Sequence, residues 1–326
     1  MLGRNERSSK PYVVTKLVSR IIGGHGRRLF QPGFALITAV FFYSSASCSF
    51  AGAAQAATWQ TATVDSAGDV GQYTSIAVDA SAYPRISYYD YTNGDLKYAY
   101  KDGTGWHVET VDSSAVNVGW YTSLKLDASG YPRISYYYVT NGDLKYAYKD
   151  GSGWHAETVD SAGDVGQFSS LALDGSGYPH ISYYDSSNYR LKYAYKDGLG
   201  WNTETADSAV GAGFYTSIAV DASGYPRISY GESVYDVNLD YSVMHLRYAY
   251  KDGTGWHTQA VDSTGAVGLY TSIKLDASGY PRISYYDSTN GDLKYAYKDG
   301  SGWHFETVDG TNDVGSHSSI ALDAYG

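Results

Sequence analysis

The sequence predicts an all-β protein, a β-propeller of four-stranded antiparallel blades. Six tryptophans recur at nearly constant spacing, and the amino-acid sequence between them is almost the same each time. They are Trp59, Trp106, Trp154, Trp201, Trp256 and Trp303, separated by 47, 48, 47, 55 and 47 residues. Such a period is typical of arrays of supersecondary units. No part of the repeats has the periodicity of an amphipathic helix.

Each repeat contains four short runs with strand character, joined by turn-forming residues. In the first full unit these runs are 74–79, 84–90, 95–101 and 106–112. They are rich in β-branched and aromatic residues and alternate with a period of two. Turn residues such as Asn93-Gly94 separate them. Tight turns between consecutive strands make each unit an antiparallel meander.

Both faces of the predicted meander are apolar. In the second run, Ile86 and Tyr88 point to one face while Tyr89 points to the other. A sheet of this kind must be covered on both sides, and radial stacking of blades provides that cover. A β-solenoid-like array is the alternative, although its coils usually have shorter periods.

The repeats predict five complete blades plus an incomplete sixth. The repeat region opens with a strand of the fourth type, residues 59–66, and ends with a strand of the first type, residues 318–323. Either the sequence is a fragment truncated at its C-terminus, or five blades close the ring and two strands are extras. We favour the fragment.

Residues 1–56 differ in composition from the rest and predict an export signal. A basic region precedes the apolar run 34–43, and small residues follow it up to Ala56, where we expect cleavage. Residues 57–326 then form the repeat domain, in a secreted, periplasmic or extracellular location. Arg27-Arg28 is compatible with twin-arginine export, so both this route and the general secretory route remain open.

The repeat domain is strongly acidic. Residues 1–56 hold seven of the 24 Lys and Arg and one of the 34 Asp and Glu, which leaves 17 basic and 33 acidic residues in 57–326. The resulting net charge of about −16 repels phosphate backbones and anionic lipids. We therefore expect no nucleic-acid partner and, after removal of the signal, no membrane insertion.

The repeated text resembles that of secreted bacterial propeller-type repeat proteins. The units read LKYAYKDGxGWHxETVDS followed by YPxISYYD, and the resemblance covers residues 59–326. The turn from Asp102 to Trp106 is also similar to a shortened Asp box, the hairpin of sialidases and related secreted glycan-active proteins, although it is one residue shorter than that pattern. This resemblance implies a propeller and no particular activity.

The turns between the second and third strands gather carboxylate and amide groups beside tyrosines. Together with the insertion in the fourth unit they supply twelve candidate ligand-binding residues, namely Asp90, Asn93, Asp95, Asn141, Asp143, Asp185, Asn188, Asp236, Asp240, Asp287, Asn290 and Asp292. Planar polar groups next to aromatic rings suit the hydroxyls and C–H faces of sugars. The same residues also suit turns and solubility.

One unit breaks the symmetry. After Tyr230 the fourth unit carries about eight extra residues, among them Glu232, Asp236 and Asp240. This loop would be the site of any enzymatic activity, but a tolerated surface insertion explains it equally well. No metal site or cofactor is predicted, because each turn offers too few carboxylates for calcium.

Three functions fit these features. A non-catalytic, multivalent binding module for glycans or a cell-surface ligand is favoured, because near-identical blades would supply repeated weak sites whose avidity multiplies. A structural or adhesion element without a small ligand is the second. A divergent glycosidase or lyase is the third, and the retained symmetry argues against it, because catalytic groups must differ in kind and converge.

Overall fold

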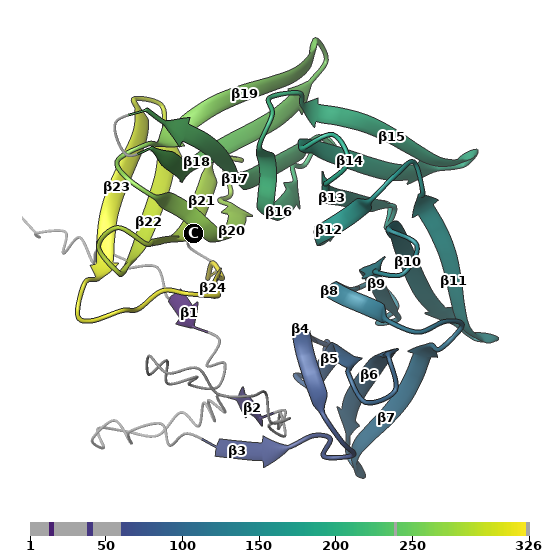
Figure 1. The fold of residues 1–326 in the computed structure, drawn as a ribbon. Coiled ribbons are helices and arrows are strands. Elements are labelled where there is room, and N and C mark those ends of the chain that lie inside the picture. The colour runs from purple at the N-terminus through teal and green to yellow at the C-terminus, as the bar shows by residue number, and fades with distance from the viewer. Residues whose placement is uncertain (1–12, 16–37, 42–59, 238–239, 324–326) are drawn as a thin grey trace, which may run out of the picture.

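Five four-stranded antiparallel sheets surround a common centre in the computed structural model (Figure 1). The structure describes residues 13–15, 38–41, 60–237 and 240–323. The all-β propeller prediction is confirmed, and the solenoid alternative is wrong because the units lie around an axis and not along a line. The described residues contain no helix that is long and apolar enough to cross a bilayer.

Every sheet has its strands in sequence order, with the first strand nearest the axis and the fourth at the rim (Figure 1). The first strands are β4 (Val70–Val78), β8 (Val118–Leu126), β12 (Val165–Leu173), β16 (Ala212–Val220) and β20 (Val267–Leu275). The second strands are β5 (Pro84–Asp90), β9 (Pro132–Tyr138), β13 (Pro179–Asp185), β17 (Pro226–Asp236) and β21 (Pro281–Asp287). The third strands are β6 (Asp95–Asp102), β10 (Asp143–Asp150), β14 (Arg190–Asp197), β18 (Tyr241–Asp252) and β22 (Asp292–Asp299). The fourth strands are β7 (Gly105–Asp112), β11 (Gly153–Asp160), β15 (Gly200–Asp207), β19 (Gly255–Asp262) and β23 (Gly302–Asp309).

Two further strands flank the five sheets, as the incomplete sixth blade requires. β3 (Gln60–Thr63) precedes the first sheet, and β24 (Ser318–Ile320) follows the last. They pair with β2 (Thr38–Phe41) and β1 (Val13–Thr15), respectively. Those two pairings belong to the uncleaved chain, and the remainder of the predicted export signal lies outside the described residues.

The inner strands begin earlier than the sequence predicts. β4 starts at Val70 instead of Thr74, because the chain bulges between Val70 and Ser75 and the pairing with β5 shifts there. Tyr73 lies in this bulge with a left-handed φ of 52°. The same bulge, with an aromatic residue at its left-handed position, recurs in the other four units.

Apolar side chains fill the space between neighbouring blades. At the interface of the first two units, Leu96 and Tyr98 of one blade pack with Leu124, Ile134 and Tyr136 of the next. All five side chains are buried. Equivalent clusters lie between the later blades. The apolar faces identified in the sequence are therefore covered by neighbouring copies of the same unit.

Three polar links cross each complete interface at different distances from the axis. Near the axis, the hydroxyls of Ser87 and Thr122 are 2.8 Å apart. Farther out, the buried Asp112 carboxylate accepts hydrogen bonds from Tyr136 and from Lys145 of the next blade. These links replace the hydration that the buried polar groups lose.

At the rim, a carboxylate of one blade binds two groups of the next. Glu157 accepts hydrogen bonds from Lys196 at 2.7 Å and from the Trp201 indole at 2.8 Å. The same contact is made by Trp154, Trp256 and Trp303. The indole nitrogen of each donates to an acceptor of the preceding blade, about one repeat earlier in the sequence, which explains why these tryptophans recur at the start of a fourth strand.

Replacement of Glu157 by Ala should destabilise the propeller by about 1–3 kcal/mol, because a charged acceptor is lost and both donors remain. A lower urea midpoint would be the expected result. Glu306 occupies the equivalent position on β23, where it is exposed, so Glu306→Ala is the matched control and should leave the midpoint nearly unchanged. Equal effects of the two variants would contradict the proposed role of the interblade contact.

Acid should weaken the interfaces. Burial raises the pKa of Asp112, but hydrogen bonds from Lys145, Ser114 and Tyr136 outweigh burial and lower the pKa to about 2. Since this value lies below that of the unfolded chain, the contribution of Asp112 is present above about pH 4 and is lost as the pH falls towards 2. Urea midpoints measured between pH 5 and 2 should therefore fall less steeply for Asp112→Asn than for the unchanged protein. The exposed equivalent Asp309, changed to Asn, should leave the slope as it is.

Candidate functional site

The structure places the predicted binding residues at the turns of one end of the ring, where several of them hold the turns together. Asp90 is buried, and its two carboxylate oxygens accept hydrogen bonds from the backbone and the side-chain amide of Asn93. Asp185 with Asn188 and Asp287 with Asn290 repeat this arrangement. These carboxylates are therefore engaged in turn formation.

The remaining predicted residues lie at the same end without converging on one point. Asp95, Asp143 and Asp292 begin the third strands and are half-buried, and Asn141 is exposed. Burial raises the pKa of Asp95. In the fourth unit, the Tyr235 hydroxyl donates a hydrogen bond to Asp240 near the hairpin tip, four residues beyond Asp236. A binding role for these residues stays a prediction.

A pocket of about 580 Å³ lies at this end, between the third and fourth blades. Its wall includes the aromatic side chains of Tyr184, Tyr189, Phe214 and Tyr235. Glu232 contributes a carboxylate. Sequence reasoning identified the insertion that forms one side of this pocket and missed the residues of the third blade.

Tyr184 contributes a hydroxyl without a hydrogen-bond partner among the described residues. At the equivalent position of the other units, the hydroxyl of Tyr89 donates to Asn117 at 2.7 Å, and that of Tyr137 donates to Asp164 at 2.5 Å. In the fourth unit Gly211 stands at the place of Asp164, so no such acceptor faces Tyr184. The hydroxyl is thus available to a ligand.

Tyr189 replaces a turn glycine. The equivalent residues Gly94, Gly142 and Gly291 have φ angles of 77°, 73° and 75°, and Tyr189 adopts the same left-handed conformation with φ of 57°. A tyrosine there is strained, whereas glycine is not. Its side chain is 56% exposed at the pocket wall, so burial of the ring does not offset the backbone strain.

The extended hairpin of β17 and β18 forms the opposite wall. Gly231 stands where the first three units have a buried tyrosine, and a Cβ atom there would lie 2.8 Å from the sulfur of Met244. The next residue, Glu232, corresponds to the turn-forming Asp90 of the first unit but faces a longer hairpin. Its carboxylate lies 3.4 Å from Nε of Arg247.

Phe214 joins the pocket to a series of aromatic rings near the axis. Its ring centroid is 4.4 Å from that of Tyr184 and 5.8 Å from that of Phe168. Phe168 belongs to the bulge residues Tyr73, Tyr121, Phe168, Tyr215 and Tyr270, whose successive centroids are 4.6–4.8 Å apart. The apolar wall of the pocket therefore continues to the axis.

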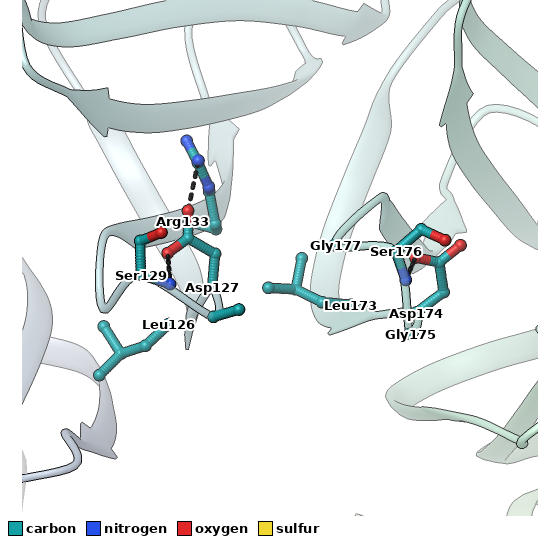
Figure 2. Close-up of a pocket in the computed structure, with 10 residues that line it drawn as sticks. Leu126, Asp127, Ser129, Arg133, Leu173, Asp174, Gly175, Ser176 and Gly177 are labelled. Atoms are coloured by element: carbon teal, nitrogen blue, oxygen red, sulfur yellow. Dashed lines mark hydrogen bonds and ion pairs between the residues drawn. The ribbon is translucent and has the colours of Figure 1, made fainter.

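A second pocket, of about 520 Å³, opens at the other end of the ring between the second and third blades (Figure 2). Asp127 and Arg133 are its main charged groups, and they bind each other at 2.6 Å. Asp127 also accepts hydrogen bonds from the backbone of Ser129 and Tyr131. Arg133 thus pairs within its own blade, and the third blade contributes Asp174, which accepts hydrogen bonds from the backbone of Ser176 and Tyr178.

No three His, Cys, Asp or Glu side chains gather as a metal site would require in the parts of the chain that the structure describes. The histidines of the fourth strands instead bind the aspartate of their own hairpin, as His107 does with Asp102 at 3.0 Å.

No family model matches the chain, and no curated protein matches it. Solved structures share its fold. A structure of the SapL1 lectin in complex with alpha methyl fucoside is 16% identical, with a TM-score of 0.50 over 73% of this chain and 83% of that one. A polysaccharide lyase, an ulvan lyase, is 13% identical with a TM-score of 0.50, over 79% of this chain and 70% of the other. A protein of unknown function from Dyadobacter fermentans is 9% identical with a TM-score of 0.53, over 76% and 85%. At these identities the likeness shows a common propeller fold and nothing further.

Replacement of the strained Tyr189 by Gly should raise stability by roughly 0.5–1 kcal/mol, because the left-handed conformation favours glycine. A higher urea midpoint is expected. The control is Tyr178→Gly, an exposed tyrosine in a turn at the other end of the ring with no left-handed φ. That variant should be neutral or destabilised, and a midpoint that falls equally in both variants would contradict strain at Tyr189.

Proposed function

We propose that this protein is an exported, non-catalytic glycan-binding module whose ligand site is the pocket between the third and fourth blades. One observation carries the proposal. The substitution of glycine by Tyr189, the small residue Gly211 and the longer hairpin from Gly231 to Arg247 meet at this pocket. Other departures from the repeat, such as His180, Asn202 and Gln259, lie outside it.

The chemistry of the wall suits a sugar. Aromatic rings offer flat apolar surfaces to the C–H faces of a pyranose, and few polar groups at fixed positions orient it. The Tyr184 hydroxyl can donate to a sugar oxygen, and the Glu232 carboxylate can accept from a sugar hydroxyl in a charge-assisted bond. A ligand would then bridge the two blades.

The structural likenesses agree with this ligand class. Among the propellers of similar fold, one is a lectin with a bound fucoside and another is a polysaccharide lyase. At their low identity they support a glycan only together with the pocket itself. The basic and apolar leader of residues 1–56 supports export, which would bring the domain to extracellular glycans.

The pocket favours binding over catalysis. Glycoside hydrolysis generally uses two carboxyl groups on either side of the bond. Glu232 is the one Asp or Glu among the residues that line this pocket, and it lies beside Arg247. Because Tyr189, Gly211 and the long hairpin do not recur in the other units, we propose one binding site per chain in place of the repeated weak sites that the turns suggested.

Tyr184→Phe should weaken glycan binding about 2- to 10-fold, which corresponds to the loss of one hydrogen bond. The measurement is a glycan array followed by isothermal titration with the best ligand. Tyr137→Phe is the matched control, because the hydroxyl of Tyr137 is bound to Asp164 inside the blade interface, and its affinity should be unchanged.

Absence of retention on the array would overturn the glycan proposal and favour a structural or adhesion element. Appearance of shortened or unsaturated products from a bound glycan would overturn the non-catalytic part and favour a glycosidase or lyase. Equal loss of affinity in Tyr184→Phe and Tyr137→Phe would place the site elsewhere.

A further inference from the structure

The charged groups of the pocket restrict the charge of the glycan that it can bind. We infer that the site selects neutral glycans and rejects sugars that carry a carboxylate or sulfate group, an inference that rests on the proposed glycan-binding function. Apart from tyrosine hydroxyls, the one ionisable side chain among the lining residues is that of Glu232. Any anion that fills the pocket must approach this carboxylate.

Arg247 does not cancel the charge of Glu232. Its guanidinium lies 3.4 Å from Glu232 and 4.0 Å from Asp207. One cation is therefore shared by two carboxylates, and the group keeps a net charge of −1. Arg247 is not among the residues that line the pocket, and its guanidinium is already engaged by these two carboxylates.

The fifth unit shows the same ratio of charges, one cation to two carboxylates, beside a turn of ordinary length. There Lys294 lies 2.7 Å from Asp262 and 3.9 Å from Asp287. However, Asp287 is buried and its oxygens bind Asn290 within the turn. In the fourth unit the longer hairpin removes that turn, and the surplus negative charge faces the pocket through Glu232.

The surroundings strengthen the repulsion. Asp236 and the exposed Asp240 lie farther along the same hairpin as Glu232. Arg190, next to Tyr189 in the sequence, is an exposed cation. With residues 57–326 at a net charge of about −16, an anionic sugar meets a negative field before it reaches the site. A neutral sugar meets no such barrier and can donate a hydroxyl to Glu232.

The test uses matched pairs of glycans that differ in one acidic group, such as lactose against sialyllactose and oligomers of galactose against those of galacturonic acid. Isothermal titration at about 20 mM salt should give at least about tenfold weaker binding for the acidic member. The difference should shrink at about 500 mM salt, because salt screens the repulsion.

Glu232→Gln should reduce the ratio of neutral to acidic affinity, even if both affinities fall. Glu306→Gln, which removes an equal charge from the outer strand β23, is the control and should leave the ratio as it was. Equal or tighter binding of the acidic member, or a ratio that Glu232→Gln does not change, would overturn the selectivity while leaving glycan binding in place. If neither member of any pair binds, the proposed function fails, and the selectivity fails with it.

Discussion

The whole structure depends on the burial of apolar blade faces against one another at the four interfaces between the five blades. Each unit presents a donor surface on one side, with a Lys and a Trp, and an acceptor surface on the other, with a Glu or a Gln. Glu109 thus binds Lys149 and Trp154, about one repeat later in the sequence. A residue at an interface is therefore constrained by a partner in the next copy, which keeps the copies alike.

Because of this constraint, positions at an interface where one unit differs from the others need a structural explanation. Protein interiors are close-packed, so a change from a large to a small residue at an interface must be compensated or leaves a space. Replacement of a buried tyrosine by Gly231 is compensated by Met244, which lies against it. Replacement of an aspartate by Gly211 is not compensated in the same way, since the hydroxyl of Tyr184 keeps no partner there. The pocket lies where that second change meets the longer hairpin.

Much of the fold could be predicted from the sequence, because the signals are local and occur five times. The Asn93-Gly94 turn and the position of Pro84 at the start of a strand follow from backbone chemistry alone. The inner-strand bulge at Tyr73 escaped prediction, although the glycine two residues before it, Gly71, is a residue that often marks a bulge within a strand. Only part of the site could be predicted. The insertion is evident from the sequence, but the role of Tyr184 depends on Gly211, which is 27 residues away and lies opposite Tyr184 across a blade interface.

Left-handed backbone conformations of residues other than glycine occur at the bulge that every unit repeats and at single turn positions such as Ala82 and Tyr189. The left-handed bulge residues, such as Tyr73 and Tyr121, recur in every unit, and their rings pack against one another at 4.8 Å. A cost of about 1–3 kcal/mol at each is offset there by contact between large side chains. Tyr189 has the same conformation only in the third unit, and its side chain is largely exposed. Strain that every blade repeats belongs to the architecture. Single left-handed residues such as Tyr189 and Ala82 stand where other units have glycine, and of these two Tyr189 is the one that lines the pocket in which we propose a ligand.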